Sequence, residues 1–125
     1  VLGLTFKPNT DDMREAPALA ILPPLLDRGA RIRAHDPKGM AEARGLLPAA
    51  VEYCDDPYTT LDGADALVLM TEWNEYRGLD LDEVRQRMAG RVVVDLRNVY
   101  DPRRMAAEGF DYHCVGRRVD ALRPG

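Results

Sequence analysis

Gly3-Leu4-Thr5-Phe6-Lys7-Pro8-Asn9-Thr10-Asp11-Asp12-Met13-Arg14-Glu15-Ala16-Pro17 is the stretch that decides the fold, because it carries an apolar strand through a polar loop into a helix. The apolar run 1–6 predicts a buried strand. In an open α/β sheet, ligands bind beyond the carboxyl ends of the strands, so this loop is expected to lie at a site. Its cations are of the kind that hold phosphate. Because no G-x-G-x-x-G follows the strand, the loop lacks the pattern of a dinucleotide-binding loop.

The rest of the chain alternates short apolar strands with amphipathic helices. The pattern predicts strands over 31–35, 51–53, 65–71, 91–96 and 110–115, and helices over 16–28, 40–45, 56–61, 80–88 and 102–108. The pair Pro23-Pro24 is expected to kink or break the first helix. Alternating strands and helices predict right-handed crossovers and parallel pairing. The expected fold is α/β: a Rossmann-like, doubly wound, mainly parallel sheet of five or six strands with helices on both faces.

Length and charge narrow the class of protein. The 125 residues suffice for one domain, expected over 1–120, with a tail over 121–125. The net charge of −4 gives no sign of a nucleic-acid footprint, so an anion site must depend on local Lys and Arg. No apolar run approaches the roughly 20 residues that span a bilayer. Because the chain opens directly on a strand without an initiator methionine, it is expected to be a fragment of a longer protein.

The cysteines and histidines do not suggest catalysis. Cys54 and Cys114 lie outside any C-x-x-C pattern and are expected to be buried, reduced thiols of a cytosolic protein. His113 and Cys114 are neighbours on a predicted strand, so they point to opposite faces and are poor co-ligands of a metal. No nucleophile can be paired with its base. The residues alone indicate a binding domain without a catalytic or metal site.

Two cations follow strands that are expected to end at the same edge of the sheet. Lys7 comes after the first strand and Arg97 after the fifth, and together they could hold a diphosphate. The alternative, solvated or ion-paired loop residues, stays equally open. Asp11, Asp12 and Glu15 precede a helix and are expected to cap it rather than bind a metal. Arg14 is badly placed for the dipole of that helix, so it is expected to have an acidic or anionic partner.

Two further segments have a structural and a functional interpretation. The pair His35-Asp36 follows the second strand, where an acidic residue holds the ribose in dinucleotide folds. Without the glycine loop upstream, a turn at Asp36-Pro37 is favoured instead. Trp73 and Tyr76 could stack a base, but a place in the core or at a domain interface is favoured.

The blocks 3–17, 35–37, 71–73 and 95–98 together resemble the C-terminal domain of the UDP-glucose/GDP-mannose dehydrogenase family, and most closely its bacterial UDP-glucose 6-dehydrogenases. The resemblance implies the UDP-binding part of an enzyme that oxidises UDP-glucose twice, with two NAD, to UDP-glucuronate. It places Phe6 and Lys7 along the nucleotide sugar, with Lys7 near the phosphates, and Arg97 against UDP. It also implies that Arg14 reaches across the cleft toward NAD.

The resemblance has two clear limits. The family's catalytic cysteine lies in a Cys-Phe-Pro segment that neither Cys54 nor Cys114 matches, so the chain is expected to be inactive alone. The resemblance implies that NAD is held mainly by an N-terminal domain, in a cytoplasmic homodimer that supplies polysaccharide synthesis. A dehydrogenase of GDP-mannose or of a UDP-N-acetyl amino sugar is the nearest alternative. A flavodoxin-like phospho-receiver and a purely structural oligomerisation domain are more distant ones.

Overall fold

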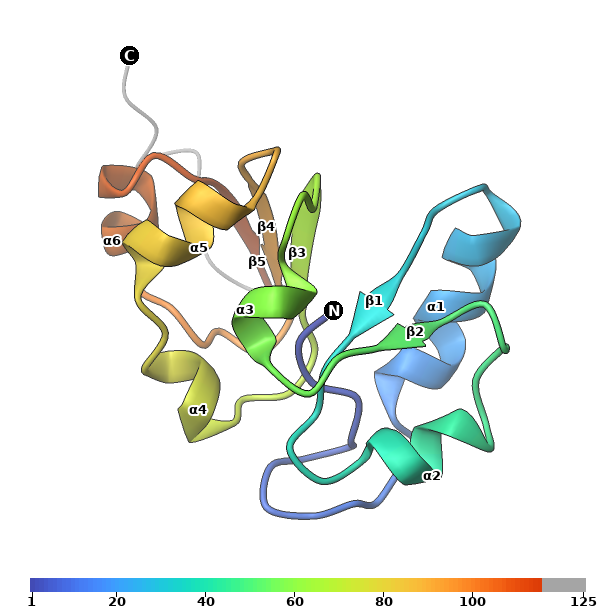
Figure 1. Ribbon diagram of the computed structural model, residues 1–125. Helices are drawn as coiled ribbons and strands as arrows, with labels where there is room; N and C mark the ends of the chain where they lie inside the picture. Colours follow the sequence, from blue (N-terminus) through green and yellow to red (C-terminus); the bar gives the residue numbers. More distant parts are fainter. Residues whose placement is uncertain (116–125) are drawn as a thin grey trace.

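The computed structural model describes residues 1–115, so the predicted tail 121–125 lies outside the described residues. Helices and strands alternate as expected, although most are short (Figure 1). The helices are α1 Pro17–Asp27, α2 Met40–Arg44, α3 Pro57–Thr60, α4 Asn74–Arg77, α5 Leu81–Arg87 and α6 Pro102–Ala107. The strands are β1 Arg33–Ala34, β2 Glu52–Tyr53, β3 Ala66–Leu69, β4 Val92–Asp95 and β5 Asp111–Cys114.

All described strand pairs are parallel. β1 pairs with β2, and β3, β4 and β5 form a second sheet in that order. Leu2 joins the two sheets, because it makes parallel bridges to His35 of one segment and to Leu69 of the other. With the Leu2 segment counted as the first strand, the order across the molecule is β2, β1, Leu2, β3, β4, β5. This is the doubly wound order 3-2-1-4-5-6, so the predicted fold class is confirmed.

The first strand is much shorter than the predicted span 1–6. Gly3 has φ +93°, and a Cβ at this position would lie 2.6 Å from the backbone nitrogen of Thr71. Beyond Gly3 the backbone N–H groups of Leu4 and Thr5 turn toward the Asp36 carboxylate instead of a neighbouring strand. The strand therefore ends early because a side chain replaces the ladder as hydrogen-bond acceptor.

Two further elements differ from the sequence-based expectation. α1 is not broken: it runs through Pro23 and Pro24. Pro23 and Pro24 have no N–H group to donate to the carbonyls of Leu19 and Ala20. Leu19 is half-buried and Ala20 is exposed, so both carbonyls can bond water instead. The structure also adds α4, which Tyr76 anchors in the core.

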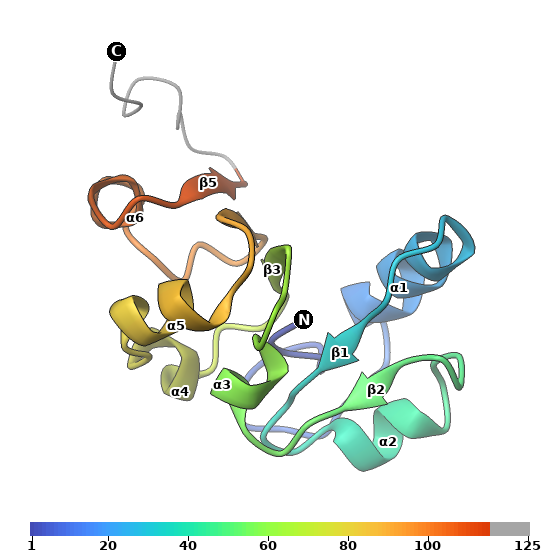
Figure 2. The same cartoon turned by 45° about the horizontal axis from the view of Figure 1, so that its top comes forward.

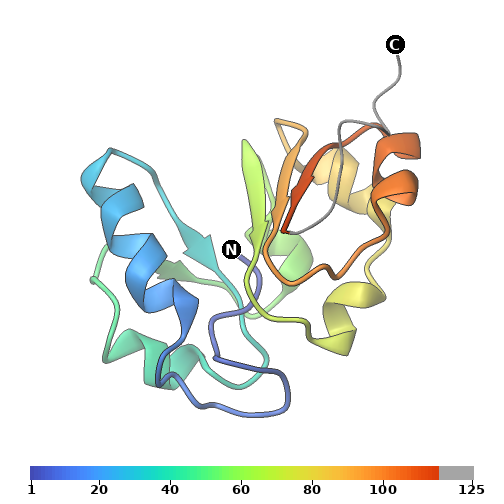
Figure 3. The ribbon, with the colours of Figure 1, turned by 180° about the vertical axis from the view of Figure 1, so that it is seen from behind.

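The core consists of two clusters on opposite faces of the sheet. The larger packs α4, α5 and α6 against β3, β4 and β5, around Tyr76, Val84, Val93 and Met105. The smaller packs α1 and α2 against β1 and the Leu4 segment. Figure 2 shows β1 and β2 side by side between α1 and α2, and Figure 3 shows α1 on the face opposite to α5. Helices on both faces are thus confirmed, and the strand ends are left free to build a site.

Candidate functional site

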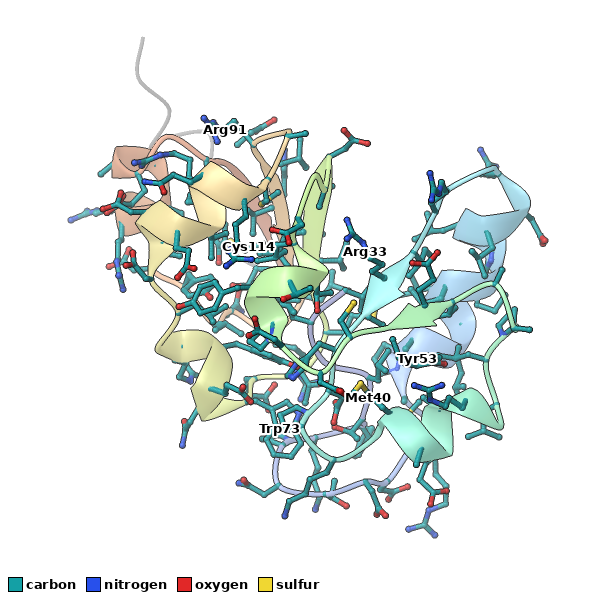
Figure 4. All side chains as sticks on the ribbon, in the orientation of Figure 1. Arg33, Met40, Tyr53, Trp73, Arg91 and Cys114 are labelled. Atoms are coloured by element: carbon teal, nitrogen blue, oxygen red, sulfur yellow. The ribbon has the colours of Figure 1, made fainter. Side chains whose placement is uncertain are left out.

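The carboxyl ends of the parallel strands meet at one edge, where four loops come together. The loop from Gly3 to Ala16 passes along this edge between α2 and α4, at the bottom of Figure 1. Trp73 and Met40 lie at the same edge in Figure 4, whereas Arg91 lies at the opposite one. The strand order reverses between the first strand and β3, and doubly wound folds bind ligands beyond the carboxyl ends of the strands at such a point.

Asp36 is the centre of this edge. Its side chain is fully buried, and it joins the loops that follow the first strand, β1 and β3. Oδ1 accepts hydrogen bonds from the backbone N–H groups of Lys38 at 2.9 Å and Gly39 at 2.7 Å. Oδ2 accepts from Leu4 N–H at 2.7 Å, Thr5 N–H at 3.1 Å, the Thr5 hydroxyl at 3.2 Å and Trp73 Nε1–H at 3.3 Å.

The surroundings of Asp36 do not fit a dinucleotide. Because the carboxylate is buried and already accepts from six donors, it cannot also hold a ribose. The predicted turn at Asp36-Pro37 is confirmed. Asp36 is therefore not available to a dinucleotide ribose in the way that the acidic residue of the glycine-loop domains is.

Two threonines fasten the first loop to the loop after β3. The Thr71 hydroxyl donates to the carbonyl of Thr5 at 2.7 Å, and both side chains are buried. The single hydroxyl proton of Thr5 lies within reach of two acceptors, Asp36 Oδ2 and the carbonyl of Lys7, the latter at 3.0 Å. Thr5 therefore contacts Thr71, Asp36 and the backbone carbonyl of Lys7, and connects Lys7 to Asp36.

Phe6 and Lys7 both present their side chains at this edge. Phe6 is 40% exposed, unusual for a large apolar side chain. Lys7 is exposed and forms no ion pair with any other residue of the described range 1–115. An accessible aromatic ring beside an unpaired cation suits a ligand that has both a planar or sugar part and an anionic part.

Arg97 is held by an ion pair at the end of β4. Its Nε and Nη2 contact the Glu72 carboxylate at 2.5 and 3.1 Å, and this hydrogen bond holds the pKa of Glu72 below its ordinary value. Its backbone N–H donates to the buried Asp95 at 3.1 Å. The Arg97 guanidinium, which the sequence predicts to bind a diphosphate, is therefore directed toward Glu72 through Nε and Nη2. Nη1 has no hydrogen-bond partner within residues 1–115, which leaves donors for an anion.

Lys7 and Arg97 are linked through their neighbours. Glu72, the partner of Arg97, follows Thr71, and Thr71 is bonded to Thr5 beside the Phe6–Lys7 pair. The sequence-based expectation that the loops after the first and fifth strands share one edge is confirmed.

The acidic residues before α1 do not cap it, so that prediction is wrong. The N-cap of α1 is Ala16, without a side-chain hydrogen bond, and its first turn holds no acidic residue. Asp12 instead binds Arg14: Oδ1 accepts from its backbone N–H and Nε, and Oδ2 from Nη2 at 3.1 Å. Hydrogen bonding to Arg14 also lowers the pKa of Asp12. The predicted acidic partner of Arg14 is confirmed, and the Arg14 side chain stays 89% exposed.

The aromatic residues after β3 belong to the core, as favoured from sequence. Trp73 and Tyr76 are 6% and 0% exposed. The Tyr76 hydroxyl donates to the carbonyl of His35 at 3.0 Å and lies 2.8 Å from its Nδ1. Burial lowers the pKa of the His35 imidazole. The His35 imidazole is therefore neutral and belongs to the packed interior beneath the site.

Both cysteines are free thiols, as expected, but half-buried rather than fully buried. Sequence reasoning missed the roles of Asp36, Thr5, Thr71 and Glu72. Only the polar character of residues placed at strand ends could have pointed to them. In residues 1–115 no helix has both the length and the apolar character that crossing a membrane requires.

The comparisons with known proteins agree with this geometry. The family model described as "UDP-glucose/GDP-mannose dehydrogenase family, UDP binding domain" matches residues 1–102. A UDP-glucose 6-dehydrogenase of Rhizobium meliloti (strain 1021) is 50% identical over 117 residues, which cover 94% of this chain and 26% of the relative. The chain thus spans about a quarter of the length of this relative.

Two solved structures share the fold. One is a UDP-glucose dehydrogenase from the archaeon Pyrobaculum islandicum, with a TM-score of 0.72 and 42% identity over 90% of this chain and 23% of the other. The other is an NDP-N-acetyl-D-galactosaminuronic acid dehydrogenase from Methanosarcina mazei Go1, with a TM-score of 0.83 and 28% identity over 99% of this chain and 25% of the other.

Proposed function

Because this chain belongs to the UDP-glucose/GDP-mannose dehydrogenase family as its UDP binding domain, we propose that its carboxyl edge is one half of the nucleotide-sugar site of an NAD-dependent UDP-glucose 6-dehydrogenase. The observation that supports this most is the linkage of the Phe6–Lys7 loop to Arg97 through Thr5, Thr71 and Glu72. Lys7 and Arg97 contact the diphosphate, and Phe6 lies along the nucleotide sugar. The alternatives of a phospho-receiver and an oligomerisation module are set aside by the family match and by the strand order, which is not the flavodoxin-like 2-1-3-4-5.

The parent chain supplies what this domain lacks. NAD, when bound by the parent enzyme, is the hydride acceptor for the oxidation of UDP-glucose to UDP-glucuronate. In this chain, Arg14 is the residue that reaches NAD: it is exposed, and Asp12 orients its guanidinium. The domain over 1–120 then acts beside an N-terminal NAD-binding domain in a cytoplasmic homodimer serving polysaccharide synthesis. The two free thiols suit a reducing compartment.

A titration of the chain with UDP tests the half-site. Lys7→Ala and Arg97→Ala should each weaken UDP binding by about 1.5–3 kcal/mol, the range for hydrogen bonds to charged groups. Arg28→Ala is the matched control, because Arg28 is an exposed cation at the far end of α1. Calorimetry that gives equal UDP affinity for all three variants and the unsubstituted chain would remove both residues from the site.

A second substitution tests the cofactor side. Arg14→Ala in the full-length enzyme should raise KM for NAD and leave UDP affinity unchanged, because the exposed Arg14 side chain is assigned to NAD and is held by Asp12 rather than by Lys7 or Arg97. A loss of UDP affinity in this variant would instead place Arg14 at the sugar nucleotide.

The identity of the sugar that is oxidised has a second candidate, a UDP-N-acetyl amino sugar. The Methanosarcina mazei structure, an NDP-N-acetyl-D-galactosaminuronic acid dehydrogenase, covers 99% of this chain. We favour UDP-glucose because the relative at 50% identity is named for it. Oxidation of a UDP-N-acetyl amino sugar or of GDP-mannose, but not of UDP-glucose, by the full-length protein would reverse this choice.

A further inference from the structure

We propose that Asp36 is the positioning residue of this half-site: its one buried carboxylate holds the loop of Phe6 and Lys7 and the loop of Thr71 to Trp73 in the arrangement that binds UDP. The inference rests on the function proposed above and adds to it a residue that contacts no ligand. Asp36 lies beneath the edge and is fully buried, so its effect on UDP must pass through its neighbours.

The path from Asp36 to Lys7 is short. Oδ2 fixes the N–H groups of Leu4 and Thr5 and shares the Thr5 hydroxyl proton with the carbonyl of Lys7. These contacts set the direction in which the backbone leaves the sheet and thus where Lys7 projects. A methyl group on Gly39 would lie 2.4 Å from Thr5 Cγ2, so the loop after β1 is packed directly against this residue.

A second path leads from Asp36 toward Arg97. The indole N–H of Trp73 donates to Oδ2 at 3.3 Å, and Trp73 follows Glu72, the partner of Arg97. Thr71, on the other side of Glu72, is bonded to Thr5. Glu72 is therefore held from both of its chain neighbours, and both connections end at the same carboxylate.

The chemistry of this position calls for a carboxylate. All six donors are neutral N–H or O–H groups, and Asp36 makes no ion pair within residues 1–115. A carboxylate is acceptor-only on both oxygens. An amide would present a donor either to Lys38 and Gly39 or to the Leu4–Thr5 segment, and one of the two loops would lose its acceptor. Asp36→Asn keeps the shape of the side chain, removes its charge and replaces one of the two acceptor oxygens by a donor.

The test is a UDP titration of the chain followed by fluorescence. Trp73 is the only tryptophan of the sequence and donates to Asp36, so its emission reports the contact directly. We expect Asp36→Asn to change the emission and to raise the Kd for UDP about tenfold, the effect of one hydrogen bond at a charged group. Val84→Ala, in the core of α5, is the control for a loss of stability remote from the site.

A matched pair tests the path through Thr5 without changing the buried charge. Thr5→Val removes the hydroxyl that bridges Asp36 and Lys7, and Thr5→Ser keeps it. We expect about a fivefold higher Kd for UDP in the valine variant and about the original value in the serine variant, since one neutral hydrogen bond is lost only in the first.

A double-mutant cycle separates positioning from general destabilisation. Lys7→Ala should weaken UDP binding strongly in the unsubstituted chain and less than about twofold in the Asp36→Asn background, because residues that act as one unit are not additive. An equal effect of Lys7→Ala in both backgrounds, or an unchanged Kd in Asp36→Asn, would overturn this inference and leave the half-site standing. No UDP binding by the unsubstituted chain would overturn the proposed function, and this inference with it.

Discussion

Replacing Tyr112 by phenylalanine should destabilise the domain more than any other removal of a single hydroxyl group near the end of β4. Tyr112 is 2% exposed, and its hydroxyl donates to Oδ2 of the fully buried Asp95 at 2.6 Å. The carbonyl of Tyr100 lies 3.1 Å from the same hydroxyl. Asp95 in turn receives the backbone N–H groups of Arg97 and Tyr100 and so shapes the loop that carries Arg97.

The expected loss follows from this geometry. Phenylalanine keeps the buried ring, so the hydrophobic contribution of the side chain is unchanged. What is lost is one hydrogen bond to a charged group, worth about 1.5–3 kcal/mol, and the carboxylate oxygen is left under-satisfied away from water. With an m-value of about 2 kcal/mol per molar urea, a loss of about 2 kcal/mol lowers the unfolding midpoint by about 1 M.

Urea unfolding followed by circular dichroism measures this shift. Tyr58→Phe is the matched control, because within residues 1–115 the Tyr58 hydroxyl accepts a single hydrogen bond, from Asp80 N–H at 2.8 Å, and this bond is exposed to solvent. We expect a loss below about 1 kcal/mol in the control, as for a neutral hydrogen bond. A smaller loss in Tyr112→Phe than in Tyr58→Phe would refute the view that Asp95 depends on this donor.

Three further changes test other parts of the structure. Gly3→Ala should cost clearly more stability than Gly29→Ala, as measured by urea unfolding. Both glycines have a positive φ, which costs alanine about 1–2 kcal/mol. Of the two, only an added Cβ at Gly3 meets other atoms, the backbone nitrogen and the Cβ of Thr71 at 2.6 Å. Burial lowers the pKa of His35, so the unfolded state binds more protons than the folded state. The free energy of unfolding should therefore fall as the pH drops below about 6.5, the ordinary pKa of histidine. His35→Gln should reduce this dependence of the unfolding free energy on pH. Asp80→Ala removes the N-cap of α5, bonded to Asp82 and Glu83 N–H, and should lower stability by about 1 kcal/mol in thermal unfolding; an unchanged midpoint would contradict the capping role.

The sequence predicts the class of this fold well because β3 and β4, on which the larger core cluster is built, each carry an apolar run. The segments around β3 and β4 are short valine- and leucine-rich runs, and both were predicted as strands. The first strand is overpredicted, since hydrophobicity does not show that the backbone N–H groups of Leu4 and Thr5 donate to a side chain 32 and 31 positions away. α4 was missed because its four residues carry no helical period.

The candidate site was predictable in its location and not in its internal bonding. Lys7 and Arg97 could be assigned to one edge, because parallel strands end together. The partner of Arg97 could not be found in this way: Glu72 follows a different strand, and only the spatial order of β3 and β4 brings the two side chains together. For Asp12, local charge favoured a helix cap, but the helix starts five residues later at Pro17, and Arg14 is nearer.

Asp36 is buried and bonded to Leu4 and Thr5 in this fold because no glycine-rich loop follows the first strand. In a dinucleotide domain, the first strand leads directly into a helix, and its loop amides face a pyrophosphate, so the acidic residue after the second strand stays free to hold a ribose. Here α1 begins only at Pro17, so the N–H groups of Leu4 and Thr5 do not lie at the start of a helix. Buried amides need an acceptor, and the nearest position able to offer one from the neighbouring strand is Asp36. Once that carboxylate is used inside the protein, the N–H groups of Leu4 and Thr5 are not available to an anion, and the exposed side chains of Phe6, Lys7 and Arg14 are what the loop offers to a ligand.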